Sequence, residues 1–154
     1  MKKYNCLAPN EEIFVNGGEY KAIEDVEIGD TVLSTDGQYH KVSKVYTFEK
    51  PCYYLSLSDG QHIECSNTHR FLINKTKMNK ASSWKTAEEL HDGDEIFAID
   101  IFKTFNNNEE TNIKMSKYKI IRKISSGTNR VIDLTVDDTH NYISANGLIN
   151  HNCN

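Results

Sequence analysis

The stretch KAIEDVEIGDTVLS, residues 21–34, combines a short helical segment, a Gly-Asp turn and a β-branched run. A similar stretch, KTAEELHDGDEIFA, occupies residues 85–98, and the two align at an offset of 64 with shared Lys, Glu, Gly and Asp. Two further pairs of segments align at an offset of 79, namely Lys44-Val45 with Lys123-Ile124 and Leu55-Ser56-Leu57 with Leu134-Thr135-Val136. The constant spacing within each block indicates a duplicated unit, whose second copy is 15 residues longer. Chance similarity between turn-rich strands is the alternative.

Short strands and tight turns make up most of the chain. Turn signals recur at Asn16-Gly17-Gly18, Gly29-Asp30, Asp36-Gly37, Asp59-Gly60, Asp92-Gly93-Asp94 and Asn146-Gly147. The runs between them that alternate or are rich in β-branched residues are 31–34, 41–46, 53–57 and 131–136. This pattern predicts an all-β domain with only two short helical stretches, at 22–26 and 86–90. The extra residues of the second copy fall near 99–118, where the polar segment NNNEETN (106–112) predicts an exposed loop.

Length and composition set the protein class. The 154 residues suit one domain, and 38% apolar with 26% charged residues is ordinary for a soluble globular protein. A net charge of −4 argues against a nucleic-acid partner. No apolar run reaches the roughly 18 residues that a membrane helix needs, and no signal peptide is recognised. We therefore expect a cytoplasmic monomer with reduced thiols. The cysteines at 6, 52, 65 and 153 form no C-x-x-C pair, so neither a metal site nor another cofactor is expected.

The sequence ends with a group of reactive residues, His151-Asn152-Cys153. An Asn side-chain nitrogen can attack its own backbone carbonyl, which closes a succinimide and expels the next residue as an amine. The reaction is intramolecular, so little further ordering is required. Because amide nitrogen is a poor nucleophile, proton transfer must assist it, and the imidazole of His151 is suited to that task near neutral pH. This chemistry would cut the chain before Cys153.

Cys6 offers a complementary reaction near the other end of the sequence. Its thiol can attack the carbonyl of Asn5 and convert an amide into a thioester. The step runs uphill, so it needs a proton for the departing nitrogen and stabilisation of an oxyanion. Candidates for this assistance are Ser66 and His69 in CSNTHRFLI (65–73) and Asp133 and His140 in DLTVDDTHNYI (133–143). Taken singly, each of these residues has a simpler structural explanation, and only their joint arrangement favours catalysis.

Taken together, these motifs resemble those of inteins, the protein-splicing elements with the Hint (hedgehog/intein) fold. CLAPNEEIFV (6–15) is similar to the family's opening block, and GQHIECSNTHRFLI (60–73) is similar to the second block, whose usual signature is T-x-x-H. NRVIDLTVDDTHNYISANGLINHNC (129–153) covers the two closing blocks. The resemblance implies a horseshoe-like β domain with a pseudo-twofold repeat. It also implies a domain at 6–152, flanked by extein remnants at 1–5 and 153–154, and the exteins are its only implied partners.

The resemblance also implies a role for each candidate. Cys6 would perform the N-to-S acyl shift, His69 would protonate the departing nitrogen, and Ser66 would orient the peptide. Cys153 would take over the acyl group in a transthioesterification, with Asp133 relaying protons. Asn152 would then cyclise with help from His151 and His140, and an S-to-N shift would ligate Asn5 to Cys153. The segment near 99–118 is too short for the homing endonuclease of larger relatives, so a mini-intein without nuclease activity is expected.

Departures from the family pattern leave some questions open. Ser66 replaces the usual Thr, and loss of the methyl group predicts a slower first step. A disulfide from Cys65 to Cys6 or Cys153, or zinc bound by Cys6, Cys153 and nearby histidines, would inhibit the reaction. Two alternative functions remain: a bacterial intein-like or hedgehog-type autoprocessing domain that cleaves without ligation, and a non-catalytic β binding module.

Overall fold

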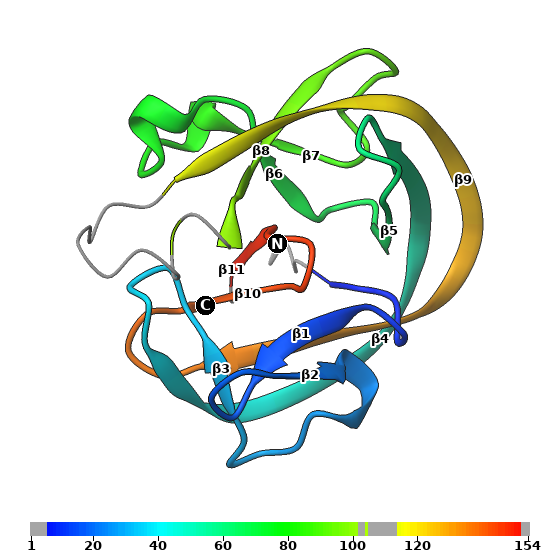
Figure 1. Ribbon diagram of the computed structural model, residues 1–154. Helices are drawn as coiled ribbons and strands as arrows, with labels where there is room; N and C mark the ends of the chain where they lie inside the picture. Colours follow the sequence, from blue (N-terminus) through cyan, green and yellow to red (C-terminus); the bar gives the residue numbers. More distant parts are fainter. Residues whose placement is uncertain (1–5, 102–103, 105–113, 152–154) are drawn as a thin grey trace.

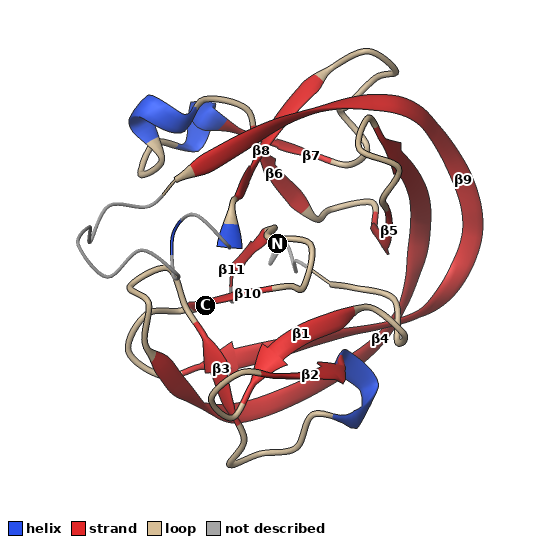
Figure 2. Cartoon of the chain, viewed as in Figure 1, coloured by secondary structure: helices blue, strands red, loops and turns tan. Residues whose placement is uncertain are grey.

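The structure of the protein is a computed structural model that describes residues 6–101, 104 and 114–151. Strands dominate it, and the helical segments are short (Figure 2). The strands are β1 (Glu12–Val15), β2 (Glu19–Ala22), β3 (Thr31–Leu33), β4 (Tyr39–Leu57), β5 (His62–Ser66), β6 (Arg70–Leu72), β7 (Trp84–Thr86), β8 (Glu95–Ile99), β9 (Met115–Val136), β10 (Asn141–Ile143) and β11 (Ile149–His151). Three 3-10 turns are η1 (Ile23–Asp25), η2 (Lys75–Lys77) and η3 (Ala81–Ser83). The predicted all-β class is confirmed.

The duplicated unit is visible in the hydrogen bonds as well as in the strand order. β3 and β8 begin at residues 31 and 95, which keeps the offset of 64. Before β3, the amide of Gly29 donates to the carbonyl of Val42 at 2.9 Å. Before β8, the amide of Gly93 donates to the carbonyl of Ile120 at 2.7 Å, which is the equivalent bond. Both glycines have φ near +100° or +90°, a conformation that disfavours side chains, so the Gly-Asp turn is required in both copies.

Two long antiparallel strands hold the copies together. β4 and β9 pair from Val42↔Val136 to Leu57↔Ile120, with three register shifts along the way. β9 arcs around one side of the molecule (Figure 1). The sheet order is β2-β1-β3-β4-β9-β8-β6-β7, and β5 pairs with β4. One copy therefore lies on each side of the β4–β9 pair.

Two details of the predicted elements were wrong. The separate strands expected at 41–46 and 53–57 are one strand, β4, because β9 supplies pairing partners from Val42 to Leu57, across the gap between them. The helix expected at 86–90 is only a turn, in which the amide of Leu90 donates to the carbonyl of Thr86 at 3.2 Å. The predicted helix at 22–26 is present as the 3-10 turn η1.

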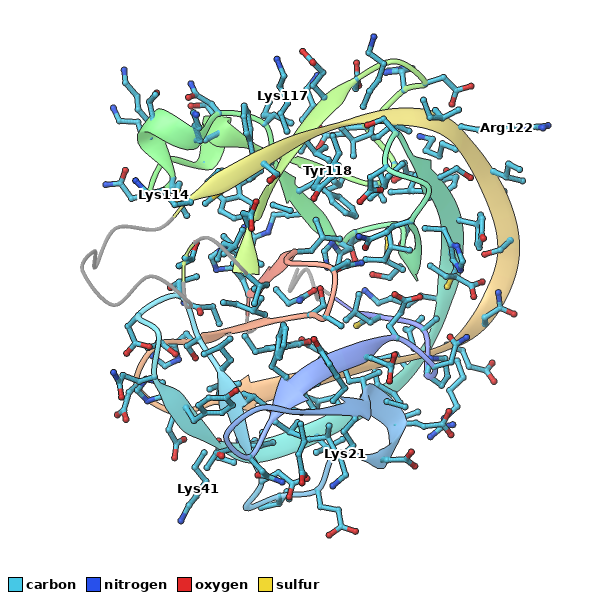
Figure 3. The ribbon with its side chains drawn as sticks, in the orientation of Figure 1. Lys21, Lys41, Lys114, Lys117, Tyr118 and Arg122 are labelled. Atoms are coloured by element: carbon cyan, nitrogen blue, oxygen red, sulfur yellow. The ribbon has the colours of Figure 1, made fainter. Side chains whose placement is uncertain are left out.

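Alternating burial explains why these segments are strands. Along β9, Lys117 and Lys119 are exposed, whereas Tyr118 is half-buried and Ile120 is fully buried. Figure 3 shows Lys117 at the periphery and Tyr118 toward the interior of the same strand. A period of two in burial is the signature of a strand with one face on the core. The large core lies on that inner face and includes Leu55, Ile63, Phe71, Ile120 and Leu134.

The β10–β11 hairpin occupies the middle of the molecule, between the two copies (Figure 1). Its strands contact β3 and β1 on one side and β6 on the other. At its turn, the carbonyl of Gly147 accepts a 2.8 Å hydrogen bond from the amide of Ile99 at the end of β8. The closing residues of the described chain are therefore held at the centre of the fold.

The inserted segment lies between β8 and β9. β8 ends at Ile99 and β9 already begins at Met115, so the predicted loop at 99–118 is too long at its C-terminal end. Most of the segment, including NNNEETN, lies outside the described residues, so its exposure stays a prediction. The described residues include no helix that is long and apolar enough to cross a membrane.

Candidate active site

The first described residue, Cys6, is held between two strands of the long sheet. Leu7 exchanges backbone hydrogen bonds of 3.0 and 2.9 Å with Ile132 of β9, and it also bridges Cys65 of β5. The amide of Ser66 donates to the carbonyl of Cys6 at 3.0 Å. Cys6 itself is fully buried. The backbone at Cys6 and Leu7 is therefore held in the core, between β5 and β9.

Ser66 lies directly beside the backbone of Cys6. The amide of Cys6 donates to Ser66 Oγ at 3.4 Å, and Ser66 is fully buried. This amide is the nitrogen that would leave in an N-to-S acyl shift. Ser66, one of the predicted site residues, therefore contacts the first junction directly.

His69 follows β5 in a tight turn, where its amide donates to the carbonyl of Ser66 at 3.1 Å. The imidazole is fully buried, its ring lies 4.6 Å from that of Phe71, and Nε2 is 2.6 Å from Asn150 Oδ1. Burial, which penalises the charged ring, lowers the pKa of His69 to about 4. The side chain is therefore neutral at neutral pH, and its protonated form would release the proton more readily than an ordinary imidazolium.

Asp133 is a fully buried carboxyl on β9. Its Oδ1 accepts hydrogen bonds from the amide of Leu134 at 2.9 Å and from the Tyr142 hydroxyl at 3.1 Å. Burial raises the pKa of Asp133 to about 7, against the lowering effect of these two bonds. A group with such a pKa can both take up and release a proton near neutral pH.

His151 ends β11 and is half-buried. Its ring lies edge-on to Trp84 at 4.5 Å, and a cavity of about 280 Å³ opens beside the two rings and Arg70. Burial, together with the charge of Arg70, lowers the pKa of His151 to about 4. Asn152 and Cys153 lie outside the described residues, so the predicted nucleophiles of the second junction are not placed.

His140 stands apart from the buried groups. It is exposed, with a φ of 57°, in the turn between β9 and β10. The β10–β11 register pairs Asn141 with His151, so His140 directly precedes the residue that pairs with His151. The structure thus does not bring His140 to Cys6, but its position is compatible with a role at the second junction.

Asn150 and Tyr142 were missed by sequence reasoning. Both are fully buried in the β10–β11 hairpin, where they contact His69 and Asp133. The available signal for Asn150 was a polar residue directly after the apolar pair Leu148-Ile149. Nothing in the sequence distinguished Tyr142 from an ordinary core aromatic.

The three described cysteines are all buried, in two different apolar clusters. Cys6 packs in a small cluster with Cys52 and Val131, whereas Cys65 packs in the large core. Burial raises the pKa of the Cys65 thiol well above its ordinary value. None of the described cysteines is in a disulfide, and the described residues include no group of three or more metal-ligating side chains. Inhibition by a Cys65 disulfide or by zinc stays a prediction.

Comparison with known proteins agrees with this geometry. The intein splicing domain family matches residues 11–152, and the chain belongs to that family. It is a mini-intein with the Hint fold, and its activity is protein splicing by self-processing of its own precursor, whose flanking exteins are its partners.

Solved inteins share the fold at low sequence identity. The DnaB intein from Synechocystis sp. PCC 6803 is 23% identical, with a TM-score of 0.71 over 96% of this chain and 97% of that one. The Ssp DnaB mini-intein variant M86 is 22% identical, with a TM-score of 0.73 over 97% and 95%. The gp41-1 intein is 23% identical, with a TM-score of 0.67 over 96% and 98%.

One curated relative is the DNA-directed RNA polymerase III subunit rpc2 of Dictyostelium discoideum, which is 26% identical over 115 residues. The match covers 67% of this chain, and it spans 7% of the length of that relative.

Proposed function

We propose that the chain splices in cis, with residues 6–152 as the excised domain and residues 1–5 and 153–154 as the remnants of its exteins. The observation that carries this proposal is the burial of the Cys6 amide against Ser66 Oγ in the core of a splicing fold. A non-catalytic binding module would have no need to bury this peptide beside a hydroxyl.

In the first step, Cys6 Sγ attacks the Asn5 carbonyl carbon, and the bond from that carbon to the Cys6 nitrogen breaks. The thiol proton ends on the new amine, transferred through the imidazole of His69. Ser66 holds the nitrogen in place through the 3.4 Å contact. The low pKa of His69 supports this role, because a protonated His69 releases its proton readily.

In the second step, Cys153 Sγ attacks the thioester carbonyl and Cys6 leaves as a thiolate. One group must take the proton from Cys153 and return it to Cys6. Asp133, whose pKa is about 7, is suited to both transfers. Its buried position beside Tyr142 supports this relay role.

In the third step, Asn152 Nδ2 attacks its own carbonyl carbon, and the bond to the Cys153 nitrogen breaks. His151 and His140 exchange the protons that this cyclisation requires. Support comes from the β10–β11 register, which pairs His151 with Asn141, the residue that follows His140. An S-to-N shift then joins Asn5 to Cys153 without further catalysis.

The test is a fusion of the chain between two foreign proteins, analysed by mass spectrometry. Parent protein is expected to yield a ligated product, Cys6→Ala to yield none, and Asn152→Ala to accumulate a thioester or branched species. Separate fragments without ligation would favour the cleavage-only, hedgehog-type alternative. An unprocessed parent would refute the proposal.

A further inference from the structure

The amide of Asn150 is fixed in one orientation by its surroundings. Its Nδ2 donates to two backbone carbonyls, those of Tyr142 at 3.3 Å and Leu148 at 3.2 Å. A flipped amide would place Oδ1 against both carbonyl oxygens, which cannot donate a hydrogen bond. Oδ1 therefore faces His69 Nε2, at 2.6 Å, in a fully buried environment.

This orientation decides which nitrogen of His69 carries the proton. Oδ1 of an amide only accepts, so Nε2 must be the donor in the 2.6 Å contact. The ring is neutral at neutral pH and has a single N–H, so Nδ1 keeps its lone pair. Among the described residues Nδ1 is buried and has no hydrogen-bond partner. Nδ1 is thus the atom left available for proton exchange.

We propose that Asn150 is a positioning residue for the first splicing step, holding His69 as its Nε2–H tautomer so that Nδ1 passes the proton from the Cys6 thiol to the Cys6 nitrogen. This inference rests on the proposed function of His69. The proton balance closes, because the thiol loses one proton, the departing amine gains one, and His69 is unchanged at the end.

The position of Asn150 gives this contact a second consequence. Asn150 precedes His151 on β11, and β11 carries the chain into the second junction. A change in β11 that moves Asn150 also frees the ring of His69, which serves the first junction. β11 therefore carries both the amide that contacts His69 and, one residue later, His151.

The experiment uses the full chain with both Asn152→Ala and Cys153→Ala, in which thiol-induced release of the N-terminal flank reports the first step alone. Asn150→Leu removes the acceptor at similar volume, and Asn150→Asp keeps the acceptor but adds a charge facing the ring. Asn141→Leu is the matched control, since Asn141 is a buried amide of the same hairpin that bonds Thr35 and Thr139 instead of His69. Each variant is assayed from pH 4 to 9, and the ring nitrogens are observed by ¹⁵N NMR.

The parent is expected to show the Nε2–H tautomer. Asn150→Leu is expected to mix the tautomers and slow release by about tenfold, which is part of the roughly 10²–10⁴-fold that a positioned acid–base group contributes, because His69 itself is kept. Asn150→Asp is expected to keep the tautomer and move the midpoint of the pH profile upward, because the carboxylate favours the charged ring. Asn141→Leu should leave both readouts unchanged.

An Nδ1–H tautomer in the parent would overturn the proposal. So would an Asn150→Leu variant whose tautomer and pH profile match the parent. If the parent released no fragment at all, the proposed function would fail, while the NMR result would still decide whether Asn150 sets the tautomer.

Discussion

Replacing Asp133 with Asn tests the buried carboxyl directly. The amide keeps an oxygen that can accept from the Leu134 amide and the Tyr142 hydroxyl, as Asp133 Oδ1 does. The amide nitrogen of the new Asn takes the place of Asp133 Oδ2, which is buried and has no hydrogen-bond partner among the described residues. The substitution therefore removes an ionisable group and leaves the packing nearly unchanged.

The raised pKa of Asp133 determines whether the unfolding free energy rises or falls with pH. Burial raises the pKa of Asp133 from its ordinary 3.8 to about 7, so the folded state holds the proton more tightly than the unfolded chain. The stability that this group contributes is fully present below pH 3.8 and is lost as the pH rises through 7. At about 1.4 kcal/mol per pH unit, the difference between the two pKa values corresponds to about 4 kcal/mol.

The assay is urea unfolding between pH 4 and 9 in a Cys6→Ala, Asn152→Ala background, which keeps the chain intact. Relative to Asp133→Asn, the parent should lose about 4 kcal/mol of unfolding free energy across this range. Asp137→Asn is the matched control, since it removes the same charge from an exposed position just after β9. Equal pH dependence in the parent and Asp133→Asn would refute the reasoning.

Three further predictions concern the first junction, the hairpin turn and the buried histidines. Ser66→Ala should slow thiol-induced cleavage at the first junction about tenfold, whereas Ser66→Thr should match or exceed the parent; equal rates in Ser66→Ala would contradict the role of the hydroxyl. Gly147→Ala should lower the unfolding free energy by about 3 kcal/mol or more, because its Cβ would meet the backbone carbonyl at the end of β8, whereas Gly127→Ala, with the same φ of about +85° but open space, should cost only about 1 kcal/mol in thermal or urea unfolding. The pKa values of His69 and His151 are lowered from 6.5 to about 4, so the unfolded chain takes up protons there more readily than the folded protein. The unfolding free energy that the two neutral rings contribute is therefore fully present above pH 6.5 and should be lost as the pH falls toward 4. His69→Gln should show a shallower loss of unfolding free energy over that range, and an unchanged slope would argue against a buried neutral ring.

Much of the fold could be predicted because its signals are local. The Gly-Asp turns at 29–30 and 93–94 require positive φ at glycine, and this requirement fixes the start of the following strand in both copies. The length of β4 could not be predicted, because the segment 47–52 is held as a strand by its pairing with the distant strand β9 and, at Cys52, with β5. Such long-range pairing leaves no mark in the local pattern.

The candidate site also combines residues that local sequence signals identify with a contact that only the assembled fold creates. Cys6, Ser66 and His69 were identified from residue types and spacing, and the structure brings Ser66 against the Cys6 amide. The partner of His69 was not identified, because Asn150 lies 81 positions away in the chain. A contact of this kind depends on where the β10–β11 hairpin docks, and only the assembled fold determines that.

The most direct test of the account is tandem mass spectrometry of the two products from the parent fusion. Splicing in cis predicts a peptide bond joining Asn5 to Cys153. It also predicts an excised 6–152 domain that is one water lighter than the same domain with a free C-terminal acid, because Asn152 has cyclised. Products that carry hydrolysed ends at both junctions, with no Asn5–Cys153 peptide, would contradict it.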